Sequence, residues 1–104
     1  MSIFRQIDFG NMVEGQSKEL RFEFDPNIVK SIRELQPSCG CTMPTIHMDA
    51  GEIRVAYTAK SVPVHLTGQG GYKAHHTILV TYVGADGAIY SDTIIFTGTI
   101  LKRR

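Results

Sequence analysis

Apolar and polar residues alternate with a period of two over several short stretches of the chain. The clearest stretch is 19–25, where three apolar residues alternate with four charged ones. Because successive side chains of a strand point to opposite faces, this alternation predicts a strand with one buried face. Similar patterns cover 51–57, 77–83 and 93–101, although Gly98 leaves a gap on the inner face of the last one. The residues predicted to face the core are Leu20, Phe22, Phe24, Ile53, Val55, Tyr57, Ile78, Val80, Tyr82, Ile94, Phe96 and Ile100.

Turn-forming residues separate these stretches. A turn at 14–15 follows a first strand expected over 7–12, residues 25–27 end the second strand, and residues 49–51 precede the central one. Residues 84–87 are expected to form the loop of a hairpin between the last two strands. Short strands at regular spacing, rich in β-branched and aromatic residues, predict an all-β fold of the sandwich or small-barrel type.

Two segments depart from this pattern. Ile28, Ile32 and Leu35 recur with helical spacing, so the local sequence alone allows a short helix over 27–36. Residues 60–71 contain one proline and three glycines without any period. Loops of this length are uncommon and are often contact surfaces, so a binding role and a plain surface loop are both open.

Length and composition place the chain among globular proteins. A length of 104 residues predicts one domain over 1–104. Charged residues make up 20% and hydrophobic residues 42%, with a formal net charge of +1. Nucleic-acid binders usually carry a basic stripe, whereas the basic cluster here is Lys102, Arg103 and Arg104 at the C-terminus. We interpret this cluster as a solvated tail, with a contact to an anionic partner as the alternative.

The N-terminal residues give an expectation about localisation. They lack a charged region followed by an apolar run, so no secretory signal is predicted, and no stretch is long enough to span a membrane. We therefore expect synthesis in the cytosol, with thiols that start reduced and with a virion as one destination.

Both cysteines of the chain flank one glycine, in Cys39-Gly40-Cys41. In an extended strand their α-carbons lie about 7 Å apart on the same face, and a bend at the glycine would bring them within disulfide range. Two thiolates with His47 six residues further on offer three ligands for zinc or cuprous copper. We favour a structural corner with two small buried thiols over a metal site and over a functional disulfide.

Histidines and common catalytic motifs do not indicate a reaction. His75 and His76 are adjacent on a predicted strand, so they face opposite sides and do not chelate one ion together. For each of them, and for His65, a solvated or hydrogen-bonded ring is expected. The sequence has no nucleophile elbow, phosphate-binding glycine loop or metalloprotease motif. We expect no enzymatic activity, no catalytic residue and no cofactor.

Ser38-Cys39-Gly40-Cys41-Thr42 resembles the signature of a bacterial family, the domain of unknown function 1573 family, which is Ig-like and related to ASH-type and major sperm protein-type domains. The further segments that match the family in order are 7–10, 14–15, 20–24, 32–37, 50–57 and 95–100. The resemblance implies an all-β, Ig-like antiparallel β-sandwich of about seven strands. It also implies a strand over 29–35 instead of a helix, and no established catalytic activity.

These observations lead to two functional hypotheses. The first is a non-enzymatic structural or interaction module that binds a protein partner or its own copies, such as a capsid decoration or tail protein of a bacteriophage. Its expected contact residues are Tyr72, Lys73, Lys102, Arg103 and Arg104. The alternative is a zinc- or copper-binding or redox module of the cell envelope, acting through Cys39, Cys41 and His47. Neither membrane nor nucleic-acid binding is expected.

Overall fold

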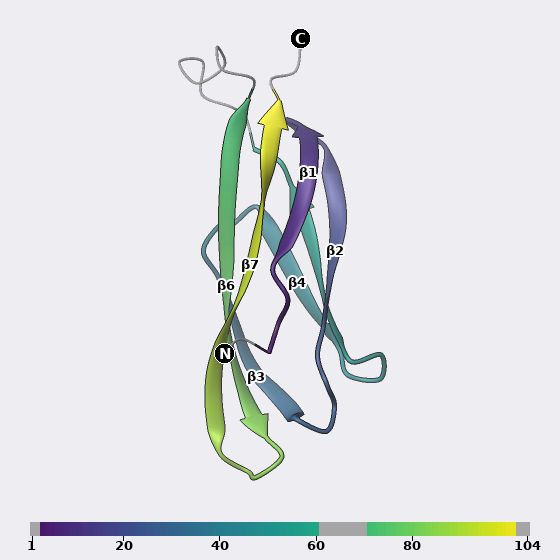
Figure 1. The fold of residues 1–104 in the computed structure, drawn as a ribbon, viewed down its shortest axis with the longest axis vertical. Helices are drawn as coiled ribbons and strands as arrows, with labels where there is room; N and C mark the ends of the chain where they lie inside the picture. The colour runs from purple at the N-terminus through teal and green to yellow at the C-terminus, as the bar shows by residue number, and fades with distance from the viewer. Residues whose placement is uncertain (1–2, 61–70, 102–104) are drawn as a thin grey trace.

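A computed structural model describes residues 3–60 and 71–101, which form an Ig-like β-sandwich (Figure 1). The strands are β1 (Ile7–Val13), β2 (Ser17–Glu23), β3 (Val29–Pro37), β4 (Thr42–His47), β5 (Glu52–Thr58), β6 (Tyr72–Gly84) and β7 (Ile89–Leu101). The seven strands confirm the predicted all-β, Ig-like fold. The described residues include no helix that is long and apolar enough to cross a membrane.

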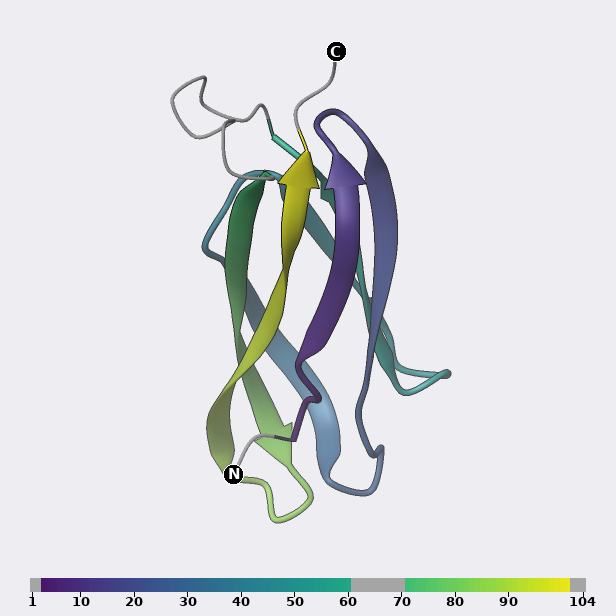
Figure 2. The same cartoon turned by 45° about the horizontal axis from the view of Figure 1, so that its top comes forward.

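Two sheets pack face to face. One has the order β1-β7-β6-β3 and the other the order β2-β5-β4. Strand β1 runs parallel to β7, whereas every other neighbouring pair is antiparallel. Figure 2 shows β6, β7 and β1 side by side in one layer. Consequently β1 and β3 are the edges of the larger sheet, and β2 and β4 are the edges of the smaller one.

The core lies between the sheets and includes every residue that the alternation predicts, together with others such as Phe9, Met12 and Val29. All residues expected to face the core are buried. The ring of Phe96 lies at the centre, with centroid distances of 6.4 Å to Phe9, 6.1 Å to Phe22 and 5.4 Å to Tyr57. Because these rings come from both sheets, Phe96 joins the two layers. The gap expected at Gly98 is filled, since the ring of Phe9 packs directly over this glycine.

The segment with helical spacing is strand β3, so the short helix that the local spacing allows does not form and the strand implied by the family resemblance is confirmed. Its pairing with β6 shifts register twice, between Val29 and Ser31 and between Ile32 and Glu34. Each bulge adds one residue, so Val29, Ile32 and Leu35 turn inward at intervals of three residues instead of two. Of the residues with helical spacing, Ile32 and Leu35 thus lie on the inward face of a doubly bulged edge strand, whereas Ile28 precedes β3 and is exposed.

Candidate functional site

The Cys-Gly-Cys corner connects β3 to β4 where the chain crosses from one sheet to the other. On one side, the Ser38 amide donates to the Thr77 carbonyl at 2.9 Å, and the Thr77 amide donates to the Ser38 hydroxyl at 3.1 Å. On the other side, the Thr58 amide donates to the Cys41 carbonyl at 3.1 Å. The corner is therefore fixed to both sheets, to β6 by Ser38 and to β5 by Cys41.

A disulfide joins Cys39 and Cys41. The expected pair of small buried thiols is therefore wrong: the described chain has no free cysteine, and both residues are only half-buried. The bend at Gly40 brings the two α-carbons to 5.2 Å, which lies within the range for a disulfide. A β-carbon added at Gly40 would meet nothing within 4 Å, so the turn has open space around it.

His76 lies on the inner face of β6, beside the corner. Its Nε2 is 3.1 Å from the Tyr57 hydroxyl, and its ring lies 5.1 Å from the Tyr57 ring and 5.4 Å from the Phe96 ring, centre to centre. Burial lowers the pKa of His76 below its ordinary value of 6.5, and the positive charges of His75 and Lys60 lower it further. The imidazole is therefore mostly neutral at pH 7.

Tyr57 is held in its protonated form. Its side chain is fully buried at the end of β5. Burial raises the pKa of Tyr57 above 10.0, with a smaller contribution from Tyr72. The phenol thus stays protonated at neutral pH, and it keeps a hydrogen bond with the neutral His76 ring.

The sulfur atoms of Cys39 and Cys41 and a ring nitrogen of His76 all lie within 4.8 Å of one another. His47, the third ligand expected from the sequence, is not part of this cluster. It lies on β4 opposite Glu52, with its Nε2 3.0 Å from the Thr45 hydroxyl. Strand β4 carries it about 16 Å from the corner, at roughly 3.3 Å per residue. The proposed ligand set with His47 is therefore replaced by one with His76.

The sequence did contain a signal for His76. Alternation along β6 puts His76 on the same face as Ile78 and Val80, while His75 is exposed on the opposite face as expected. What the sequence does not supply is the register of β3 against β6, which pairs Pro37 with Ile78 and so brings the corner next to His76. His47 is nearer to the cysteines in sequence, whereas the sheet brings His76 nearer to them in space.

A hollow of about 600 Å³ opens beside the corner. Its lining residues are Ser38, Cys39, Gly40, Tyr57, Lys60, Tyr72, His75, His76 and Ile100. Tyr72, which we expected to contact a partner, is 40% exposed and lines this hollow. The lining includes cationic and aromatic side chains but no carboxylate among the described residues. The hollow is therefore unsuited to hard cations that need oxygen ligands.

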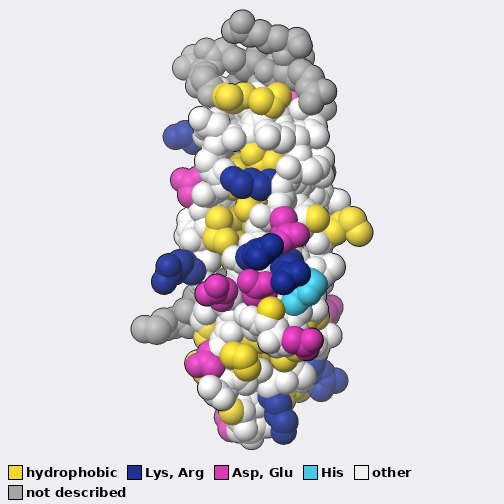
Figure 3. Space-filling model, turned by 90° about the vertical axis from the view of Figure 1, so that its right-hand side faces the viewer, with side chains coloured by type: hydrophobic (Ala, Val, Ile, Leu, Met, Phe, Trp, Pro, Cys, Tyr) yellow, Lys and Arg dark blue, Asp and Glu magenta, His cyan; other side chains and the backbone are white. Residues whose placement is uncertain are grey.

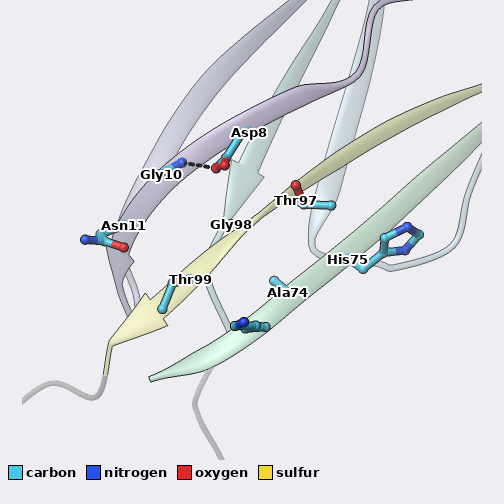
Figure 4. A pocket seen from close by; sticks show the side chains of 9 residues that line it. Asp8, Gly10, Asn11, Ala74, His75, Thr97, Gly98 and Thr99 are labelled. Atoms are coloured by element: carbon cyan, nitrogen blue, oxygen red, sulfur yellow. Dashed lines mark hydrogen bonds between the residues drawn. The ribbon is translucent and has the colours of Figure 1, made fainter. Parts of the chain in front are cut away.

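Lys73 lines a different hollow, of about 500 Å³, on the outer surface of β1, β7 and β6 (Figure 4). There the Asp8 carboxylate accepts a hydrogen bond from the Gly10 amide at 2.8 Å. The other expected contact residues, Lys102, Arg103 and Arg104, lie outside the described residues, as do His65 and most of the segment 60–71. The predicted contact residues Tyr72 and Lys73 thus line separate surfaces.

Three of the four edge strands are protected against pairing with another chain. Strand β1 is bulged between Asp8 and Asn11, and β3 carries two bulges. Strand β4 contains Pro44, which has no amide hydrogen. The Cys41 carbonyl accepts a hydrogen bond from Thr58 of β5. Because the backbone groups of successive strand residues point to alternate sides, those of Pro44 point away from β5, toward the open side of β4. Bulges and prolines are two of the usual protections of sheet edges, and charged side chains are a third.

The edge of β2 has neither a bulge nor a proline, so only its charged side chains limit pairing with another chain. Seven consecutive residues of β2 pair with β5 without a register shift, and none is a proline. The Phe24 amide donates to the Gly51 carbonyl, and the Gln16 carbonyl accepts from the Ala59 amide. The backbone N–H and C=O groups of even-numbered β2 residues therefore point toward β5. The backbone groups of Ser17, Glu19, Arg21 and Glu23 therefore face the open side. Within the described part of the chain, no strand pairs with that side.

Charged side chains form bands across the outer face of the smaller sheet. Arg21 lies opposite Arg54, and Glu23 lies opposite Glu52. Ion pairs run along each strand instead, from Arg21 to Glu19 at 3.0 Å and from Arg54 to Glu52 at 2.9 Å. Figure 3 views the molecule from the side on which β2 lies in Figure 1 and shows acidic and basic side chains next to one another.

The lowered pKa of His76 predicts a pH dependence of stability. Because the unfolded chain binds a proton near pH 6.5 and the folded chain does so only at lower pH, the free energy of unfolding should fall as pH drops below about 6.5. Below the folded-state pKa this loss stops growing. Urea denaturation between pH 5 and pH 8 measures it, and His76→Gln should flatten the profile. An unchanged slope in that variant would contradict this assignment.

Comparisons with known proteins give no family for this chain. No protein-family model matches the sequence, and no curated protein matches it. Among solved structures, a 2,6-sialyltransferase of Photobacterium sp. JT-ISH-224, in a ternary complex with CMP and lactose, aligns with a TM-score of 0.44 and 11% identity. The alignment covers 92% of this chain but 18% of that one. The chain thus spans less than a fifth of that protein, and a similarity of this size does not bear on function.

Proposed function

We propose that this protein is a non-enzymatic structural module that assembles with its own copies through the open edge of β2. The observation that carries the proposal is that β2 alone among the four edge strands combines regular pairing with the absence of proline. The setting we propose is a virion component of a bacteriophage, such as a capsid decoration or tail protein. A repeated lattice suits such a module because every copy presents the same edge.

The backbone restricts how two β2 strands can meet. Two copies related by a two-fold axis pair their strands in antiparallel fashion, and each ladder bond joins residues whose backbone groups face the open side. Those groups belong to odd-numbered residues, so odd-numbered residues must lie opposite odd-numbered ones. Near the middle of β2, three registers remain, in which Glu19, Leu20 or Arg21 lies opposite its own copy at the two-fold axis. Each register is called centred on that residue.

The side-chain charges select one of these registers. Centring on Glu19 places that carboxylate against its own copy, and centring on Arg21 places the two guanidinium groups against each other. Centring on Leu20 places Glu19 opposite Arg21 of the second copy, and the same pair forms again by symmetry. Opposite charges across a strand pair contribute about 0.2–1 kcal/mol each, whereas like charges are destabilising. The sequence of β2 is therefore complementary to itself in one register.

The existing sheet gives this register further support. Within one chain Arg21 faces the like charge of Arg54 and pairs with Glu19 along its own strand. A second copy would place a carboxylate on the free side of Arg21 and continue the smaller sheet across the two-fold axis. The strand pair is short, so we expect weak association of the kind that becomes strong only when many copies assemble. Because both side chains are exposed, added salt should weaken it.

Charge reversal tests this proposal. Arg21→Glu turns both Glu19–Arg21 pairs between copies into like-charge pairs and should raise the dissociation constant by about tenfold or more. The double variant Glu19→Arg with Arg21→Glu restores opposite charges in the same register and should restore association. Sedimentation equilibrium at concentrations up to about 1 mM measures all three proteins.

Arg33→Glu is the matched control, because Arg33 is an exposed arginine on the bulged edge of β3. It changes the net charge by the same amount as Arg21→Glu and should leave association unchanged. The proposal is contradicted if both single variants weaken association equally, or if the wild-type chain is monomeric at about 1 mM. Failure of the double variant to recover would contradict the register centred on Leu20.

A further inference from the structure

We propose that, once the disulfide is reduced, Cys39, Cys41 and His76 bind one cuprous ion at the corner. The site lies at the β3–β4 connection and shares no residue with the β2 edge, so this proposal is independent of self-association. The two sulfur atoms of the β3–β4 connection and one ring nitrogen of β6 already lie within 4.8 Å of one another, and all three residues are half-buried. A small ion can therefore reach them without unfolding the sandwich.

The corner has room for the change that metal binding requires. Sulfur atoms joined in a disulfide must move apart to roughly 4 Å to share a metal at bond lengths near 2.3 Å. Gly40 is the hinge between them, it is exposed, and open space surrounds its α-carbon. The flanking residues are anchored by the bonds of Ser38 to β6 and of Cys41 to β5. Reduction thus frees the sulfur atoms while the corner stays in place.

The donor set favours copper in its cuprous state. Two thiolates and one imidazole are soft or borderline ligands, which select cuprous copper or zinc over magnesium and calcium. Structural zinc sites take four protein ligands, whereas the cluster in the described part of the chain has three. A cuprous ion with two thiolates carries a net negative charge. Lys60 lines the same hollow and is suited to balance that charge.

The surroundings of His76 resemble the support that metal-bound histidines usually have. The Tyr57 hydroxyl lies 3.1 Å from Nε2 and fixes the plane of the imidazole. Tyr57 is itself fully buried, so its hydroxyl has little freedom to move away. Tyr57 is therefore a positioning residue for this site, and the structure predicts that its hydroxyl influences metal affinity without touching the metal.

The reaction balances with a phosphine as the reductant. The phosphine takes the oxygen of one water and becomes a phosphine oxide. The disulfide receives two electrons and two protons and becomes two thiols. Each thiol then releases its proton as its sulfur binds copper, and the copper stays in the cuprous state throughout. The oxidised chain lacks thiolates and should hold no copper.

The test is a titration of the phosphine-reduced, desalted chain with cuprous copper under nitrogen, in competition with a chromogenic cuprous chelator. Native mass spectrometry should show one copper per reduced chain and none in the oxidised chain. X-ray absorption at the copper edge should show sulfur and nitrogen neighbours. His76→Gln should weaken binding by at least about tenfold, and the double substitution of Cys39 and Cys41 by serine should abolish it.

Two further variants keep the proposal testable if His76→Gln folds poorly. Tyr57→Phe keeps the buried ring and should weaken copper binding by about tenfold through the lost hydroxyl. His47→Gln is the matched control, because His47 lies on β4 away from the cluster. The copper affinity of this variant should equal that of the wild type. The proposal fails if the oxidised chain binds copper as well as the reduced one, or if only sulfur neighbours are found.

Discussion

Replacing Phe96 with alanine is expected to lower the free energy of unfolding by about 3–5 kcal/mol. The side chain is fully buried, and its ring contacts those of Phe9, Phe22, Tyr57 and His76. Truncation removes contacts to both sheets and leaves a cavity that strands, with their fixed pairing, cannot easily close. Domains of this size are stable by roughly 5–15 kcal/mol, so the variant should lose a large part of its stability. Urea denaturation measures the loss.

Ile95→Ala is the control for this substitution. Ile95 is the neighbouring residue on β7, but it lies half-buried on the outer face of the sheet. It should lose much less stability than Phe96→Ala, because its side chain is only half-buried whereas Phe96 is fully buried. Equal losses in the two variants would contradict the placement of Phe96 at the centre of the core.

Gly98→Val is expected to destabilise the fold by about 1–3 kcal/mol or more. A β-carbon at this position would overlap Cε1 of Phe9, well inside van der Waals contact. Phe9 is itself buried against Tyr57 and Phe96, so its ring has no free space to occupy. The clash is therefore relieved only by moving β1 away from β7. Thermal and urea denaturation both report this loss.

Combining Gly98→Val with Phe9→Ala tests whether the clash with the Phe9 ring causes the loss of stability. With Phe9→Ala, the valine at 98 should fill part of the cavity, so the two substitutions together should cost less than the sum of their separate effects. Gly40→Ala is the control glycine, since its surroundings are open, and it should change stability by less than about 0.5 kcal/mol. Additive effects at positions 9 and 98 would show that the strain lies elsewhere.

Strands with one buried and one solvent-exposed face could be predicted directly from the sequence. Along 20–24 and 53–57, every second residue is apolar, and burial follows this pattern because β2 and β5 pair without bulges. The same holds for Ile78, Val80 and Tyr82 on β6. In these strands the period of two is kept, so burying the apolar residues requires no information from neighbouring strands.

Two strands could not be read in this way. The bulges of β3 change the interval between inward residues from two to three, which imitates a helix, and their positions depend on the pairing with β6. Strand β4 is short and contains Pro44, which usually argues against a strand. Its proline is tolerated because the missing amide hydrogen would have faced the open edge. Both failures concern edge strands, where protection against pairing overrides local pattern.

The candidate site was only partly visible in the sequence. The Cys-Gly-Cys corner was evident from its composition, and the bend at Gly40 was expected to allow a disulfide. The histidine beside it was misidentified because His47 is near in sequence, whereas His76 comes close through the β3–β6 pairing. The open edge of β2 was equally hidden, since its protection or exposure depends on which strands flank it.

Hydrogen exchange of the β2 amides tests the central claim most directly. If copies associate through this edge, the amides of Glu19 and Arg21 should exchange more slowly at about 1 mM than at about 10 µM, because they enter a new ladder. The amides of Thr42 and Ile46, which face the open side of β4 beside Pro44, should exchange at the same rate at both concentrations. Protection that appears on β4, with no change at Glu19 and Arg21, would contradict assembly through β2.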